Sequence, residues 1–126
     1  MTIGTLVRGD MMKKIYLCFR AAGEILSDVE TVKRYARFVA VQCGAVPIAP
    51  QIYFTKFLDD TVPEESAFGA MAGLLLLSDC DELWYFGDSV SKGMVREIIA
   101  AKEQNIPVRY VSDAEIEQIK IKNGGN

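Results

Sequence analysis

The chain has 126 residues, half of them apolar and a quarter charged, and carries a formal net charge of −3. This length suits one domain with its own core, and this composition excludes a disordered chain. The net negative charge argues against a nucleic-acid partner, since a basic doublet such as Lys13–Lys14 is too small to hold a phosphate backbone.

Histidine is absent from the sequence, so serine–histidine and cysteine–histidine nucleophiles and histidine metal ligands are excluded. Acid–base work must fall to carboxylates, tyrosines, lysines or thiols. Three widely spaced cysteines form no disulfide framework, which favours a cytoplasmic location. We expect no metal, and the Asp59–Asp60 doublet is typical of a solvated turn. The longest apolar run, Phe68–Leu77, is too short for a bilayer and predicts a buried helix, so no membrane partner is expected.

The first half of the chain predicts two strands separated by a helix. Residues 1–12 are expected to be a loose leader without the apolar core of a signal peptide. Ser27 and Glu30 have capping-box spacing, and Gly44 suits a helix end. The helix between them should turn inward Val32, Tyr35, Ala36, Val39, Ala40 and Cys43. The strands are expected at Lys14–Phe19 and Val46–Ala49, followed by a loop over Gln51–Asp60 that carries Tyr53, Phe54 and Phe57.

The second half predicts three helices and two strands. Thr61 and Glu64 again have capping-box spacing, and Pro63 suits the first turn of a helix that runs to about Ser78. Asp113 should cap a final helix with Ile116 and Ile119 inward. The other expected elements are the strand Glu82–Phe86, the turn Gly87–Lys92, a helix over 93–104 and the strand Val108–Val111.

Strands alternating with helices predict a three-layer α/β sandwich of Rossmann or flavodoxin-like type, with a four- or five-stranded parallel sheet. Residues 13–122 are the expected single domain, and 123–126 a frayed tail. Ligands of such sheets bind beyond the carboxyl ends of the strands. Three loops should meet there, namely those after Phe19 and Pro50 and the turn Gly87–Lys92.

The last of these loops opens into a helix with the pattern Ser91-x-Gly93-x-x-x-Glu97. Glycine lets a backbone approach a ligand, and the free N–H groups of a helix start favour an anion such as phosphate. Two readings of these residues stay open. Ser91 either holds a ligand or caps the helix, and Glu97 is either a catalytic carboxylate or one that the helix dipole favours.

With Tyr16 in the first strand, this pattern resembles the nucleoside 2-deoxyribosyltransferase superfamily over most of residues 13–112. The Ser-x-Gly-x-x-x-Glu pattern is similar to that of 2′-deoxynucleoside 5′-monophosphate N-glycosidases. The stretches Ile15–Phe19, Val46–Asp60 and Asp81–Val111 look more like an uncharacterised bacterial and phage branch. The resemblance implies cleavage or transfer at the N-glycosidic bond of a nucleoside or nucleotide, by a homo-oligomer that uses no cofactor.

The resemblance also implies roles for residues. Glu97 matches the glutamate that attacks the anomeric carbon, Tyr16 the tyrosine beside it, and Ser91 the serine that holds the 5′-phosphate. A carboxylate suits this task because departure of the base leaves an oxocarbenium-like sugar. Gly93 is expected beside Ser91 at the phosphate. The remaining expected substrate contacts are Phe19, Arg20, Tyr53, Phe54 and Asp88. The aromatic rings of the segment after Pro50 either stack on a base or only cover the core or an oligomer interface.

Two places differ from the family's pattern. Phe19 and Arg20 follow the first strand, where a turn of small residues is usual. Gly73 stands where active members carry an aspartate that assists the leaving base. The second difference favours another class of function, a non-catalytic nucleotide-binding module that has kept the pocket. A third hypothesis is a flavodoxin-like domain for some other phosphate ligand.

Overall fold

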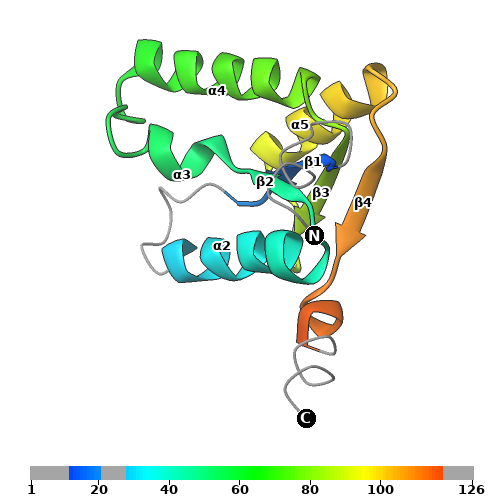
Figure 1. Ribbon diagram of the computed structural model, residues 1–126. Coiled ribbons are helices and arrows are strands. Elements are labelled where there is room, and N and C mark those ends of the chain that lie inside the picture. Colours follow the sequence, from blue (N-terminus) through cyan, green and yellow to red (C-terminus); the bar gives the residue numbers. More distant parts are fainter. Residues whose placement is uncertain (1–11, 21–27, 118–126) are drawn as a thin grey trace.

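The computed structural model describes residues 12–20 and 28–117. It shows a parallel sheet between two layers of helices, with α2 on one side and α4 and α5 on the other (Figure 1). The sheet has four strands in the order β2-β1-β3-β4, and all three pairings are parallel. The strands are β1 (Lys14–Cys18), β2 (Val46–Ile48), β3 (Glu82–Phe86) and β4 (Val108–Val111). The expected three-layer, flavodoxin-like architecture is confirmed.

The central strand β1 contributes to two separate cores, because successive side chains of a strand point to opposite faces. Ile15 and Leu17 pack in the core under α2, whereas Tyr16 and Cys18 pack in the core under α4 and α5. All four side chains are buried. The odd–even alternation of β1 therefore places Tyr16 on the side of the sheet where α5 carries Glu97.

The helix α2 (Asp28–Arg37) continues into a π-helical turn, η3 (Phe38–Gln42), and the chain then reverses at Gly44, whose φ is +65°. Ser27 of the expected capping box lies outside the described residues. Phe38 and Val39 are buried, but Ala40 and Cys43 are exposed. The prediction that these two turn inward is wrong, because a π turn holds more residues than an α turn and rotates the residues after it.

A short helix, α3 (Pro50–Phe54), occupies the start of the segment that was expected to be a loop. Pro50 stands in its first turn, where a proline fits since no intrahelical N–H bond is lost. The aromatic residues of this segment contact one another: Phe54 meets Tyr53 at a centroid distance of 4.8 Å and Phe57 at 5.9 Å. Phe54 also meets Phe68 of the next helix at 6.5 Å.

The helix α4 (Pro63–Ser78) starts after Val62 without a side-chain cap. The capping box predicted at Thr61 does not form, because the Thr61 N–H and hydroxyl both donate to Asp59 Oδ1, at 2.9 and 2.6 Å. The prediction of a buried helix over Phe68–Leu77 is correct for one face only. Gly73 and Leu77 are buried, while Phe68, Met71 and Leu75 are exposed.

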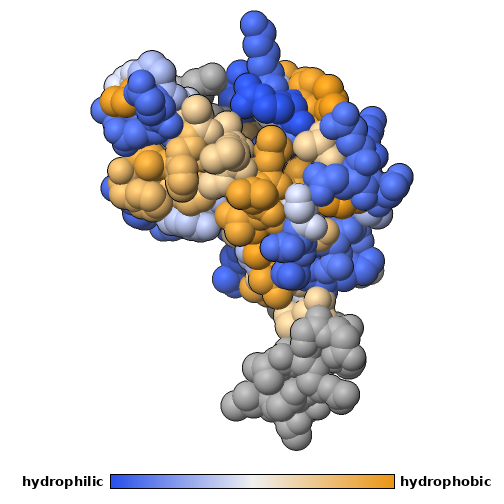
Figure 2. Space-filling model, turned by 90° about the horizontal axis from the view of Figure 1, so that it is seen from above, coloured by the Kyte–Doolittle hydropathy of each residue, from blue (hydrophilic) through white to orange (hydrophobic). Residues whose placement is uncertain are grey.

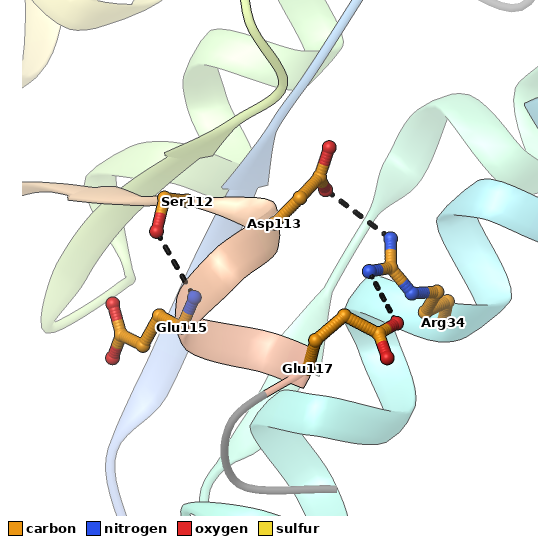
Figure 3. A network of polar contacts seen from close by, with 5 residues as sticks. All are labelled: Arg34, Ser112, Asp113, Glu115 and Glu117. Carbon is orange, nitrogen blue, oxygen red and sulfur yellow. Dashed lines mark hydrogen bonds and ion pairs between the residues drawn. The ribbon is translucent and has the colours of Figure 1, made fainter. Parts of the chain in front are cut away.

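The helix α5 (Lys92–Glu103) starts at Ser91, whose Oγ accepts the Met94 N–H at 3.3 Å. A last helical segment, 113–117, is capped by Ser112, which accepts the Glu115 N–H at 3.0 Å. Asp113, the predicted cap, instead pairs with Arg34 of α2 at 3.2 Å (Figure 3).

The same guanidinium ties a second carboxylate of this segment to α2. Arg34 contacts Glu117 at 2.9 Å (Figure 3). Ile116 is buried as expected, and Ile119 lies outside the described residues. Among the helices described, none has the length and apolar character needed to cross a membrane.

Candidate active site

The carboxylate of Glu97 accepts hydrogen bonds from residues of two other elements at the carboxyl edge of the sheet. The Tyr16 hydroxyl donates to Glu97 Oε2 at 2.5 Å, and the Gln51 Nε2 group donates to the same oxygen at 3.3 Å. The three residues come from α5, β1 and α3, so this contact exists only in the folded chain. Because both donors hold Oε2, they also set the direction of Oε1.

Burial raises the pKa of Glu97 above its ordinary value of 4.5. Hydrogen bonds from Tyr16 and from the Cys18 thiol act in the opposite direction, as does the charge of Arg96, and they offset part of the effect. The pKa of Tyr16 is raised strongly by burial and by the negative charge of Glu97. Tyr16 therefore keeps its proton at neutral pH and acts as a donor to Glu97.

The buried thiol of Cys18 belongs to this environment. Its pKa is raised by burial and by the Glu97 charge, and its Sγ lies 3.7 Å from the Met94 carbonyl oxygen. A thiol with a raised pKa is a poor nucleophile. Cys18 therefore serves as a small buried apolar residue.

Gly73 of α4 lies close to the Tyr16 hydroxyl. A Cβ atom built at this position would lie 3.1 Å from the Tyr16 hydroxyl oxygen, closer than ordinary van der Waals contact. The place that a side chain at position 73 would enter is thus occupied by the tyrosine that contacts Glu97. Gly73 therefore leaves room for the Tyr16 hydroxyl, which donates to Glu97.

In front of Glu97 lies a pocket of about 110 Å³, which we call the Glu97 pocket. Four of the expected site residues line it: Phe19, Ser91, Gly93 and Glu97. Its other walls are Gln51, Ala70, Leu74, Met94 and Arg96.

A second pocket of about 220 Å³, the Arg20 pocket, lies at the same edge of the sheet. It contains Arg20 and Asp88, and Arg20 donates to Ser89 Oγ. Phe19 lines both pockets. Ser91 and Gly93, the residues expected at the phosphate, therefore lie in one pocket, whereas Arg20 and Asp88, the other expected polar contacts, lie in the second.

A third cavity of about 330 Å³ shares Phe19 and Gln51 with the Glu97 pocket and extends between α2 and α3. Lys33 and Lys56 bring positive charge to it. The three cavities meet at the ring of Phe19, which is buried beneath them. Phe19 is thus the residue shared by the Glu97 pocket and by the cavity that holds the basic side chains.

Ser91 and Gly93 lie at the start of α5, where the sequence places them. The Ser91 oxygen accepts the Met94 N–H, so the capping reading holds, and its hydroxyl proton is still available to a ligand. A Cβ atom on Gly93 would meet only Ser91 Oγ, at the ordinary distance of 3.9 Å. The fold itself therefore does not require glycine at position 93.

Tyr53 and Phe54, expected to touch the substrate, line none of these three cavities. Their rings belong to the aromatic cluster of α3 and α4, and Tyr53 is exposed. Gln51 is the residue that the sequence did not reveal, since it was expected in a loop. A proline directly before it, typical of a first helical turn, was the one available signal.

The described residues contain no group of three or more metal-ligating side chains. Asp59 of the acidic doublet instead accepts two bonds from Thr61, and these lower its pKa.

A family model matches residues 13–111, from the start of β1 to the end of β4. The chain belongs to this family, described as Domain of unknown function (DUF7768). No curated protein matches the sequence. The family therefore defines the extent of the domain that carries the site, and leaves its chemistry to be inferred.

Among solved structures, the chain is similar to a 2-deoxyribosyltransferase from the psychrotolerant bacterium Bacillus psychrosaccharolyticus. The identity is 20%, the TM-score is 0.59, and the match covers 79% of this chain and 72% of the other. At this identity the likeness shows the fold. It confirms the fold that the resemblance inferred from the sequence implies.

Proposed function

We propose that this protein acts on the N-glycosidic bond of a nucleoside or nucleotide, with Glu97 as the nucleophile. The observation that carries the proposal is the 2.5 Å contact between the Tyr16 hydroxyl and Glu97 Oε2 beside an open pocket. A carboxylate held in one orientation and facing a cavity is what attack on an anomeric carbon needs. The fold shared with a 2-deoxyribosyltransferase supports this chemistry.

The roles of the site residues follow from their contacts. Glu97 attacks the anomeric carbon, and the Tyr16 hydroxyl stabilises its ionised form. Gln51 Oε1 is buried with no hydrogen-bond partner among the described residues, so it is placed to accept a bond from a sugar hydroxyl. Ser91 and the first N–H groups of α5 suit a phosphate, and Phe19 suits the face of a base.

Base release from nucleosides and their 5′-monophosphates tests the proposal. The panel contains ribose and 2′-deoxyribose, neutral and positively charged bases, and assays with and without a second base as acceptor. The matched control is Glu97→Gln, which keeps the shape of the side chain and removes its charge. Release by the wild type alone establishes the chemistry, and dependence on the acceptor distinguishes transfer from hydrolysis.

The second candidate function is a nucleotide-binding module without catalysis. The specific observation that favours it is Gly73, where the Tyr16 hydroxyl fills the space of a second acid. This candidate predicts no base release from any member of the panel. A nucleotide at 100 times its Kd should then stabilise the folded protein by about 2.7 kcal/mol in a thermal-shift assay, and be recovered unchanged.

We also propose that the protein works as a homo-oligomer. The outer face of α4 and the neighbouring α3 segment exposes large apolar side chains, and Figure 2 shows them gathered in a band across this side of the molecule. Such a surface is typical of a protein interface. Its exposed members are Tyr53, Phe57, Phe68, Met71 and Leu75.

This apolar α4 face adjoins the site, because Ala70 and Leu74 of the same helix line the Glu97 pocket. A second copy packed on α4 would therefore close one wall of the pocket. Between Glu65 and Asp79 the helix carries no charged residue, which suits packing against an identical face rather than a charged partner.

A further inference from the structure

Among the described residues that line the Glu97 pocket, Glu97 is the one carboxylate and no second acid is present. Cleavage of a bond to a neutral base ordinarily needs two groups, a carboxylate at the anomeric carbon and an acid that protonates the leaving atom. The nearest hydroxyl, that of Tyr16, already donates to Glu97. Its strongly raised pKa shows that it does not give up this proton readily.

At position 73 of α4, the Tyr16 hydroxyl occupies the space that an acidic side chain would need. The backbone of Gly73 lies against the Tyr16 hydroxyl, and a Cβ atom there would stand only 3.1 Å from it. The residues of α4 that line the pocket, Ala70 and Leu74, carry no acid. Asp88 belongs to the neighbouring Arg20 pocket, on the other side of Phe19.

We infer that the site takes N-glycosides whose base already carries a positive charge, such as a ribosylated pyridinium or an N7-alkylated purine. This inference rests on the proposed function and names its substrate class. A base of this kind leaves as a neutral molecule, so no acid is needed. Phe19 lines all three cavities, so a cationic ring bound there would contact an aromatic side chain. Lys33 and Lys56 match a phosphate elsewhere on the same substrate.

The chemical step balances with these groups alone. Glu97 forms a bond to the anomeric carbon, and the bond to the base breaks with its electron pair passing to the ring nitrogen. That nitrogen changes from cationic to neutral and takes up no proton. Water then attacks the anomeric carbon, the Glu97 carboxylate is released, and one proton passes to solvent.

Matched substrate pairs test the inference with the full chain. Guanosine and 7-methylguanosine share a sugar and a ring and differ in one methyl group and its charge, and their 2′-deoxy forms give a second pair. Nicotinamide riboside and its 5′-monophosphate add a pyridinium. Free base is measured by chromatography, and the rate with Glu97→Gln is subtracted from each value.

We expect release from the charged member of each pair to exceed release from the neutral member by more than about tenfold. Release from the neutral member within tenfold of the charged one overturns the inference and leaves the proposed function standing. If no substrate is cleaved while melting curves show folded protein, both proposals fail.

The pH profile provides a second, independent criterion. The charged and titratable groups that face Glu97 are Tyr16 and Cys18 from β1 and Arg96 from its own helix, whereas α3 and α4 contribute uncharged residues. With nicotinamide riboside, the rate should rise as Glu97 ionises and then stay level up to pH 8. A falling limb in this range would show that an acid takes part, which contradicts the inference.

Discussion

Glu97 holds its proton to a higher pH in the folded protein than in the unfolded chain, because burial outweighs its hydrogen bonds. The free energy of unfolding should therefore fall as the pH rises from about 4.5 towards the raised pKa. Glu97→Gln removes this titration. We expect its melting temperature to exceed that of the wild type by about 2–5 °C at pH 7, and by less at pH 4.

Circular dichroism melts of both proteins across this pH range measure the difference. Comparing the two variants cancels the titration of the other carboxylates. If the wild type instead gains stability relative to Glu97→Gln as the pH rises from 4 to 7, the pKa of Glu97 is lowered on folding. Its hydrogen bonds then outweigh the effect of burial on that pKa.

Tyr16→Phe removes the closest donor to the Glu97 carboxylate. The pKa of Glu97 should rise further, since the hydrogen bond favours the ionised form. We expect base release to fall by about 10–100-fold at pH 6 and the rising limb of the pH profile to move to higher pH. A uniform loss of rate with an unmoved limb would assign Tyr16 a packing role only.

At the scale of the helix, Gly73 has a steric role that its neighbour Gly69 lacks. Alanine at position 73 places a Cβ atom 3.1 Å from the Tyr16 hydroxyl, whereas at position 69 it meets Leu58 at an ordinary 3.5 Å. We expect Gly73→Ala to destabilise the protein by about 1–3 kcal/mol. Gly69→Ala should instead stabilise it by up to about 1 kcal/mol, the helix propensity of alanine over glycine.

A double-mutant cycle identifies the cause. Tyr16→Phe removes the hydroxyl that the added methyl group would meet, so Gly73→Ala should be tolerated better on this background. Urea denaturation of the four proteins gives the coupling free energy. Additive effects would mean that position 73 is restricted by something other than Tyr16.

The starts of α4 and α5 show how capping depends on more than spacing. Ser91→Ala removes the acceptor of the Met94 N–H and should cost about 1 kcal/mol. Thr61→Ala tests the spacing argument, since Thr61 contacts Asp59 and does not cap α4. Urea denaturation should show a smaller loss for Thr61→Ala than for Ser91→Ala, and the reverse order would contradict this assignment.

For the whole molecule, the apolar α4 face is the feature that bears on assembly. Leu75 is 66% exposed at its centre, so Leu75→Lys should separate the subunits of an oligomer without disturbing the core. Light scattering should show the mass falling towards that of one chain. Val41→Lys is the matched control, because Val41 is 57% exposed on η3, whose buried residues Phe38 and Val39 belong to the core under α2. A monomeric wild type would refute the assembly model.

Much of the fold follows from local rules that act along the chain. All four strands appear within two residues of the predicted limits. Short runs of apolar β-formers bounded by turn residues can be identified from the local sequence alone. The predictions that failed are those in which another contact replaced the local one. Thr61 bonds to Asp59 instead of capping α4, and Asp113 pairs with Arg34 instead of capping the last helix. The π turn after α2 rotates the residues that were predicted to face inward.

The sequence by itself determined the class of fold, the edge of the sheet where the Glu97 and Arg20 pockets lie, and the placement of Glu97 one turn into α5. Only the tertiary structure decided that Gln51 meets Glu97 beside Tyr16, the partner that the family resemblance implied. Tyr16 and Gln51 are separated from Glu97 by 81 and 46 positions, and no local pattern links them. Periodicity along one element states which face a residue occupies, whereas contact across elements depends on how the layers pack.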